Sequence, residues 1–348
     1  MKLFICPLPP PVHGQANVSQ DTVDLFENKV ILDTNYTNMA LTKKVVYFFS
    51  YIVEFWYYIL RYNIHVIYFT PSRSFLGALR DIPVLLVGYF FQKKVIAHIH
   101  GGDFDSFVNG LNPVFRKLLI QLYSGCDYLV FPMKQIAENS RNTLGLLNTV
   151  TVPNYLDRNT NYVADFNSAE TIQLLFMSNI LKTKGINEFM DLIAQVYKSN
   201  ITFQAKIAGS FMKEAEQEKA RVLKSQKKDL ISYLGFISGN EKIEELSKCD
   251  FFILPSYSES FGIVLIEAMA SGCIIITSNN KYHKYLIDNS FGRTFDFQNN
   301  IKGVVDFVES FKNNPKKMVE MKKAAVKEAK KYDFGSYKKQ MVKLFNEN

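Results

Sequence analysis

Short apolar runs rich in β-branched residues alternate along this chain with longer, helix-like segments. The predicted strands of the first half are Lys2–Cys6, Val30–Asp33, His65–Phe69, Lys94–Ile99, Tyr128–Phe131 and Val150–Val152. Those of the second half are Gln173–Met177, Thr202–Ile207, Ile231–Tyr233, Phe251–Leu254 and Cys273–Thr277, with helices such as Asn187–Lys198 and Glu241–Ser247 between them. This order is typical of strand–helix–strand units with parallel sheets, so the sequence predicts an α/β protein.

Two consecutive sets of such units predict two doubly wound domains. A chain of 348 residues is longer than one hydrophobic core usually holds. The polar, aperiodic segment Pro153–Ser168 is the predicted linker. We expect a first domain over residues 1–160, a second over 161–330, and a C-terminal helix, 331–348, that packs back on the first domain. Ligands of open parallel sheets bind outside the carboxyl ends of the strands, so we expect the active site in a cleft between the domains.

The cysteines and the N-terminus predict a cytoplasmic protein. None of the four cysteines belongs to a CxxC pair or lies near a histidine at metal spacing, which argues against a disulfide framework and against zinc. The opening sequence MKLFICPLPPP has too short an apolar run for a secretory signal.

Positive charge gathers near the C-terminus. The net charge is +8, and residues 311–348 hold eleven lysines against four acidic residues. Such a stripe could face an anionic membrane, an acidic substrate or nucleic acid, or it could be a solvated helix face. Because no nucleic-acid-binding signature accompanies it, nucleic acid is not expected as a partner.

The segment Val45–Leu60, VVYFFSYIVEFWYYIL, is almost wholly apolar. It is short for a membrane span and contains Glu54. A buried core helix is the preferred interpretation, with contact to a membrane surface as the second alternative and a true span as the third.

The segment Pro255–Gly272, PSYSESFGIVLIEAMASG, follows a predicted buried strand and reads as a polar turn that opens an apolar helix. This arrangement points the free N–H groups of Phe261, Gly262 and Ile263 toward a ligand. Such a helix N-terminus favours an anion, for instance a diphosphate.

Two carboxylates accompany this predicted anion site. Glu259 lies in the loop before the helix, and Glu267 lies eight residues later within an apolar run, where an unpaired carboxylate is unfavourable. Carboxylates beside a sugar or a ribose accept hydrogen bonds from pairs of hydroxyl groups. The alternative is a helix with one acidic residue near its start and one solvated glutamate.

This segment resembles the E-x7-E motif of retaining glycosyltransferases of the GT-B fold, specifically glycosyltransferase family 4 (group 1). The match includes Glu259 and Glu267 and extends to the residues around them, among them Pro255, Ser256, Ser260, Phe261, Gly262, Ile263 and Gly272. The resemblance implies two Rossmann-like domains that face each other across a cleft. It also implies that Glu259 contacts the donor sugar and that Glu267 contacts the nucleotide ribose.

Phe176–Gly185, FMSNILKTKG, is similar to a second motif of this family. The resemblance makes Lys184 the lysine that pairs with the donor diphosphate. Asn179 stands where the family usually has arginine, so the clamp loses one charge, and Lys182 is a candidate substitute. A lysine binds phosphate as a point charge, so Lys184 could carry much of the role alone. Further along, Gly235 and Phe236 correspond to a turn that lies near the base.

In the first half, His13 and Gly14 stand where the family often has a glycine pair, in a variant associated with polysaccharide assembly. The alternative is a simple proline-rich turn. His98 and His100 lie near the end of one predicted strand and on one face of it. From the residues alone they are a metal pair or core and rim histidines, whereas the resemblance makes His100 the histidine that approaches the donor sugar. Asp103 is a weaker candidate for a general base.

The resemblance implies a retaining hexosyl- or related transferase that uses a UDP- or GDP-sugar, with no metal and no other cofactor. The expected acceptor is a glycan or a lipid-linked oligosaccharide in bacterial-type surface polysaccharide synthesis, and the protein would be peripheral on the inner face of the cell membrane. Two alternatives remain. One is a sugar-nucleotide 2-epimerase of the same fold, and the other is a non-catalytic, membrane-associated scaffold.

Overall fold

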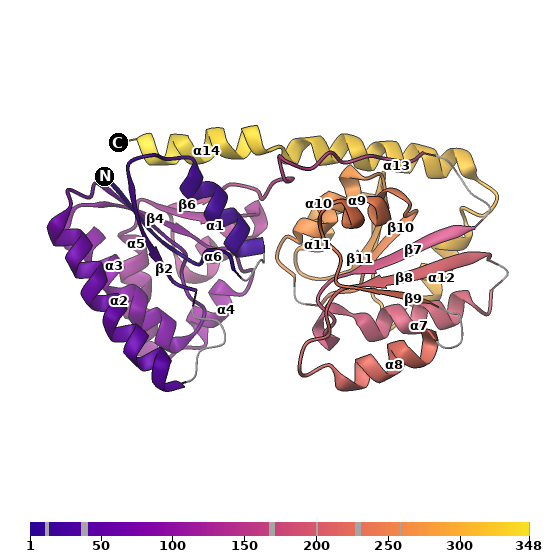
Figure 1. Cartoon of the computed structure of the whole chain (residues 1–348), viewed down its shortest axis with the longest axis horizontal. Coiled ribbons are helices and arrows are strands. Elements are labelled where there is room, and N and C mark those ends of the chain that lie inside the picture. Colours follow the sequence, from indigo (N-terminus) through magenta and orange to yellow (C-terminus); the bar gives the residue numbers. More distant parts are fainter. Residues whose placement is uncertain are drawn as a thin grey trace. The chain divides into compact units, whose positions relative to one another are not determined.

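A computed structural model describes residues 1–10, 14–35, 41–166, 171–199, 201–226, 231–257 and 259–347, and the side chains of 41–45 and 226 are not described. The chain divides into two compact units (Figure 1). The first comprises Met1–Asn154 with Gly335–Asn348, and the second comprises Tyr155–Phe334. Each unit contains one six-stranded sheet, and every recorded strand pairing is parallel. The prediction of an α/β, two-domain, Rossmann-like fold is therefore confirmed.

The sheet of the first unit has the strand order β2-β1-β3-β4-β5-β6. Its strands are β1 (Lys2–Cys6), β2 (Lys29–Asp33), β3 (Val66–Phe69), β4 (Lys94–His98), β5 (Tyr128–Phe131) and β6 (Thr149–Thr151). Its helices are α1 (Gly14–Asp24), α2 (Leu41–Arg61), α3 (Phe75–Phe91), α4 (Phe104–Asn109), α5 (Pro113–Ser124), α6 (Lys134–Leu144) and α14 (Phe334–Asn346). The inner strands are apolar and buried because helices cover both faces of a parallel sheet.

The C-terminal helix α14 packs on the first unit. The ring of Phe345 lies 4.3 Å from that of Phe26 and 5.6 Å from that of Phe4. The hydroxyls of Tyr337 and Thr22 share a buried hydrogen bond of 2.5 Å. Helix α13 (Pro315–Ala329) belongs to the second unit, so the basic C-terminal stretch is divided between the two units.

The sheet of the second unit has the strand order β12-β11-β10-β7-β8-β9. Its strands are β7 (Ile172–Met177), β8 (Phe203–Ala208), β9 (Ser232–Gly235), β10 (Phe251–Leu254), β11 (Ile274–Ser278) and β12 (Gly292–Phe295). Its helices are η1 (Lys182–Lys184), α7 (Ile186–Val196), α8 (Glu216–Gln226), α9 (Gly239–Ser247), α10 (Ile263–Ala270), α11 (His283–Leu286), α12 (Ile301–Glu309), α13 and η2 (Lys330–Tyr332). Strands β10 and β11, which both have neighbours on each side, are buried along their whole length.

The structure corrects three sequence-based expectations. Strand β12 was not predicted, because Gly292–Phe295 is short and carries an arginine at the sheet edge. Residues 155–160 belong to the second unit, where Leu156 N donates to Tyr332 O (2.8 Å) and the ring of Tyr155 lies 5.0 Å from that of Phe334.

The third correction concerns helix α2, which is not a buried core helix. Tyr51 and Phe55 are buried, but five large apolar side chains on α2 are exposed. Among the helices in the described part of the chain, none is long and apolar enough to cross a bilayer.

Candidate functional site

The order of strands in the second unit indicates a binding site at the carboxyl ends of two of its strands, β7 and β10. Strand β7 pairs with β8 on one side and with β10 on the other, so the chain direction across the sheet reverses between β7 and β10. Ligands of doubly wound sheets bind outside the carboxyl ends of the two strands at such a switch point. The loop after β7 leads to Lys184, and the loop after β10 leads to Glu259.

Lys184 and Glu259 meet at this switch point, although 75 residues separate them in sequence. Lys184 Nζ donates to Glu259 Oε2 at 2.6 Å, and both side chains are about one-fifth exposed (23% and 19%). The two loops are also joined through the backbone, because Tyr257 N donates to Thr183 O at 3.0 Å. The site therefore holds one lysine and one carboxylate at a position that remains accessible to solvent.

A glycine permits this close approach of the two loops. Gly185 has φ +80°, and a Cβ at this position would lie 2.2 Å from Pro255 O. Any side chain here would separate the loops or force the backbone out of its conformation. Gly185 therefore places Lys184 against the loop that carries Glu259.

Helix α10 begins four residues after Glu259, near the same carboxyl ends of the strands. Its N-cap residue Gly262 has φ +74° and ψ +80° and, as a glycine, contributes no side-chain cap. The first N–H groups of an α-helix have no carbonyl four residues earlier within the helix and carry partial positive charge. Here Leu265 N donates to Gly262 O at 2.8 Å, so the N–H groups of Ile263 and Val264 are the candidate donors. Phe261 is buried, with its ring 5.5 Å from that of Tyr332, and Ser260 is half-buried beside it. The helix start thus offers backbone donors to an anion.

The second carboxylate of the motif has its own lysine. Glu267 is buried on α10, and its Oε1 accepts from Lys242 Nζ on α9 at 2.6 Å. The hydroxyl of Tyr162 lies 3.4 Å from the same oxygen. Burial, and then the charge of Glu267, raise the pKa of Tyr162, so this phenol stays protonated and can donate. Glu267 is therefore a paired buried carboxylate and not a solvated one, and sequence reasoning did not identify Lys242 or Tyr162.

A buried histidine near Lys184 was also not identified from the sequence. His283, at the start of α11, is fully buried, and neither ring nitrogen has a hydrogen-bond partner. Burial lowers the pKa of His283 to about 4, and the nearby charge of Lys184 contributes to the shift. Asn280 fixes the backbone here, since its Oδ1 accepts from His283 N (2.8 Å) and its Nδ2 donates to Ser256 O (3.0 Å). No sequence pattern pointed to His283, because its relation to Lys184 exists only in the folded chain.

The remaining candidate site residues of the second unit lie at or after the carboxyl ends of β7 and β9. Asn179 follows β7 and is exposed, and Lys182 is exposed on η1. Gly235 ends β9 with φ +74°, and its carbonyl accepts from Gly209 N at 2.7 Å. Phe236 follows on the loop before α9 with 67% of its surface exposed. An exposed aromatic side chain beside a backbone turn is suited to stack on a planar ring.

The candidates of the first unit lie at the carboxyl edge of its own sheet. Gly14 begins α1, whereas His13 lies outside the described residues. His98 is fully buried with its Nδ1 2.8 Å from Tyr68 OH, and burial lowers its pKa to about 3. The ring of His100 lies 4.1 Å from that of His98, and His100 is half-buried. His98 is thus a neutral core histidine, and His100 is the more accessible of the two.

Asp103 and Arg73 form an ion pair on the surface of the first unit. The side chain of Asp103 is 61% exposed and that of Arg73 is 40% exposed. Exposed pairs of this kind contribute little to stability. In the described part of the chain, no three His, Cys, Asp or Glu side chains are grouped as metal ligands would be.

Comparison with known families gives a match over the second unit. Residues 158–328 match the family model described as "Glycosyl transferases group 1". The chain is also 25% identical over 173 residues to N,N'-diacetylbacillosaminyl-diphospho-undecaprenol alpha-1,3-N-acetylgalactosaminyltransferase of Campylobacter jejuni. That similarity covers 50% of this chain and 44% of the relative, so this chain spans less than half the length of that protein.

Solved structures of glycosyltransferases share the fold over the whole chain. Sucrose-phosphate synthase from Thermosynechococcus elongatus superposes with a TM-score of 0.78 at 15% identity, covering 99% of this chain and 97% of that chain. The Anabaena protein HepE, solved with UDP and glucose, gives a TM-score of 0.73 at 12% identity over 100% and 99% of the two chains. The family match contains both lysine–carboxylate pairs described above and nearly all of the second unit, so the second unit is similar to the group 1 glycosyl transferases, and the fold of the chain is that of GT-B glycosyltransferases.

Proposed function

We propose that this chain is a retaining glycosyltransferase that takes a sugar from a UDP- or GDP-sugar. The observation that carries the proposal is the Lys184–Glu259 pair at the switch point of the second sheet, beside the N-terminus of α10. A lysine and a helix N-terminus together suit a diphosphate, and a carboxylate beside them suits sugar hydroxyls. The UDP and glucose in the HepE structure are consistent with this type of donor.

Donor binding would exchange the partner of Lys184. The diphosphate would attract Lys184 Nζ away from Glu259 Oε2, which it contacts at 2.6 Å. The released carboxylate could then accept hydrogen bonds from the hydroxyls of the donor sugar. Glu267 would accept from the ribose hydroxyls while Lys242 keeps its charge compensated.

The chemical step would develop negative charge on the departing diphosphate. Lys184 and the first N–H groups of α10 would stabilise that charge, and fixed donors aimed at developing charge are among the strongest contributions to catalysis. We propose that these groups take the role that a metal ion has in other transferases. The acceptor hydroxyl would attack from the face that the diphosphate leaves, with a phosphate oxygen accepting its proton, so the anomeric configuration is retained.

The acceptor is proposed to be a glycan or a lipid-linked oligosaccharide of surface polysaccharide synthesis. The support is the name of the Campylobacter relative, which specifies a diphospho-undecaprenol-linked acceptor. An acceptor of this kind resides in a membrane, so we propose a cytoplasmic protein bound peripherally to the inner face of the cell membrane. The roles expected for Gly14, His13 and His100 stay predictions.

The test is a reaction of the full chain with a panel of UDP- and GDP-sugars and a membrane extract as acceptor source. We expect release of nucleoside diphosphate that depends on acceptor and persists in EDTA, and a product whose anomeric proton coupling matches that of the donor. Inverted product would contradict retention. Conversion of the nucleotide sugar without acceptor would identify an epimerase. No turnover, even after Asn179→Arg restores the usual arginine, would favour the scaffold.

A further inference from the structure

Two neighbouring helices of the first unit carry apolar side chains on their solvent side. On α2 these side chains are 54–82% exposed and occur every three or four residues, at Val46, Phe49, Val53, Tyr57 and Leu60. With a rise of 1.5 Å per residue, the stripe is about 20 Å long. On α3 the exposed apolar side chains stand at both ends, at Phe75, Leu76, Tyr89, Phe90 and Phe91. The two helices contact each other and lie along the same side of the sheet (Figure 1).

The inward sides of both helices are already occupied, so neither helix can turn to bury its stripe. Tyr51 and Phe55 of α2 are fully buried. On α3, Arg80 and Asp81 form a buried ion pair of 2.7 Å, and Asp81 Oδ2 accepts from Ser72 N at 2.7 Å.

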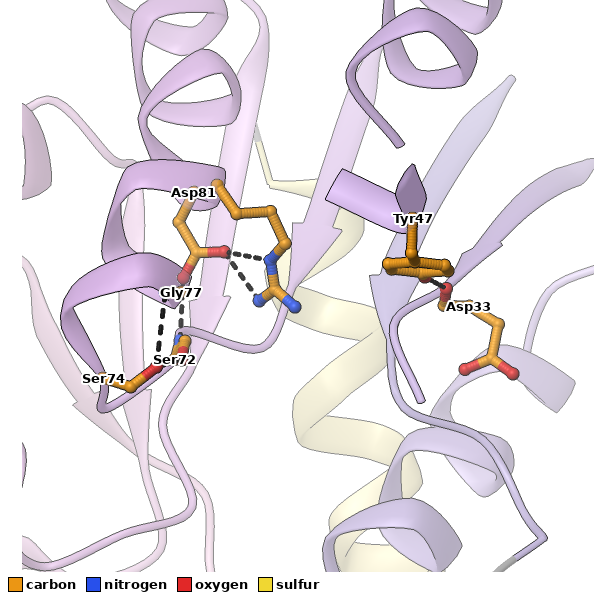
Figure 2. A network of polar contacts seen from close by, with 7 residues as sticks. Asp33, Tyr47, Ser72, Ser74, Gly77 and Asp81 are labelled. Atoms are coloured by element: carbon orange, nitrogen blue, oxygen red, sulfur yellow. Dashed lines mark hydrogen bonds and ion pairs between the residues drawn. The ribbon is translucent and has the colours of Figure 1, made fainter. Parts of the chain in front are cut away.

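Polar contacts fix the starts of these helices as well. Figure 2 shows Ser74 capping α3 through Gly77 N and the hydroxyl of Tyr47 on α2 donating to the carbonyl of Asp33. These contacts therefore hold the apolar stripes on the outward sides of the two helices. Large exposed apolar patches of this kind mark interaction surfaces.

The charge beside the stripes is positive. On the described side chains of α2, α3 and α5 the exposed cations are Arg61, Arg116 and Lys117, and the exposed acid is Glu54. The rings of Phe75 and Phe115 lie 5.1 Å apart and join α3 to α5.

On α5 itself, a hollow of about 380 Å³ is lined by Pro113, Arg116, Lys117 and Ile120. Half of these four lining side chains are cationic, so the hollow suits a phosphate group.

We propose that this face, the outer side of α2 and α3 with the cationic surface of α5, docks on an anionic lipid bilayer. Helices with apolar and aromatic side chains on one side and basic residues beside them bind at the boundary between headgroups and acyl chains. A symmetric dimer would use the same patch on both copies and would bring these cations against each other with Glu54 as the main counter-charge. Charge complementarity therefore favours lipid over a second copy.

The proposal deepens the peripheral placement proposed above and rests on it, but its test needs no donor and no acceptor. The full chain is sedimented with phosphatidylcholine vesicles that contain or lack phosphatidylglycerol. We expect binding to the anionic vesicles to be at least about tenfold tighter. Leu60→Glu combined with Phe90→Glu should weaken it by about tenfold or more, because the face loses apolar contact and gains repulsion.

The matched control is Leu147→Glu, in the loop after α6, where the leucine is 79% exposed on the same unit. It should leave vesicle binding unchanged, and equal thermal midpoints would show that all variants are folded. Arg116→Gln with Lys117→Gln should weaken binding to anionic vesicles by about fivefold per charge. No binding by the unaltered chain, or equal loss in the control, would overturn the proposal. So would a lipid-free dimer that the Leu60–Phe90 variant converts to a monomer.

Discussion

Replacing Lys242 by methionine should destabilise the second unit, because it leaves the carboxylate of Glu267 buried and unpaired. Removing one partner of a fully buried ion pair costs roughly 3–5 kcal/mol. Here the side chain of Glu267 is 9% exposed and that of Lys242 is 26% exposed, so solvent screens part of the interaction. The hydroxyl of Tyr162, at 3.4 Å, replaces little of it. We therefore expect a loss of about 2–3 kcal/mol in the free energy of unfolding.

The assay is a double-mutant cycle of Lys242→Met and Glu267→Gln, measured by urea denaturation. The control cycle uses Lys248→Met and Glu244→Gln at the C-terminal end of α9. This ion pair is also 2.6 Å long, but the side chain of Lys248 is 52% exposed and that of Glu244 is 63% exposed. We expect a coupling energy of about 2 kcal/mol for the first pair and a clearly smaller one for the second, because solvent screens an exposed pair. Similar coupling in the two cycles would refute the claim that burial makes Lys242 the support of Glu267.

Two further predictions concern residues beside Lys184, at the carboxyl ends of the strands of the second sheet. Gly185→Ala should lower the free energy of unfolding by about 2 kcal/mol or more, because its Cβ would lie 2.2 Å from Pro255 O. The control Gly145→Ala, at φ +71° with open space around the new Cβ, should lower it by only about 1 kcal/mol. Equal losses in urea denaturation would contradict the steric argument. His283 has a pKa of about 4 when folded and 6.5 as its ordinary value, so the unfolded chain takes up the proton first and stability falls as pH drops from 6.5 to 4. Compared with His283→Gln, the unaltered chain should lose roughly 3 kcal/mol more over this range, and parallel pH profiles would show that His283 is not buried as described.

Much of this site was predictable because local sequence determines it. The run Phe251–Leu254, the polar turn and the apolar helix from Ile263 follow from residue type and spacing, and the structure has them as β10, loop and α10. The contact between Lys184 and Glu259 is different, since it spans 75 residues and depends on β7 pairing with β10. A resemblance to known motifs placed both residues in one site, whereas spacing alone could not.

The residues that sequence reasoning missed act through tertiary contacts. Lys242 is a lysine on the polar helix α9, where a solvated side chain is the usual expectation, and only packing of α9 against α10 brings it to Glu267. His283 begins the short helix α11, in a segment without a recognisable sequence pattern. Helix α2 was misjudged because its apolar residues surround the whole helix, so periodicity could not show that Tyr51 faces the core while Leu60 faces solvent.

The measurement that tests the central claim most directly is the thermal stability of the full chain against UDP-, GDP- and ADP-sugars, beside the variant Lys184→Met. A ligand that binds only the folded state at 100 times its Kd stabilises that state by about 2.7 kcal/mol. We predict that one UDP- or GDP-sugar raises the Tm of the unaltered chain by several degrees, and that Lys184→Met, itself folded, loses most of this shift. A shift of equal size in the variant, or no shift with any nucleotide sugar, would contradict a donor site built around Lys184.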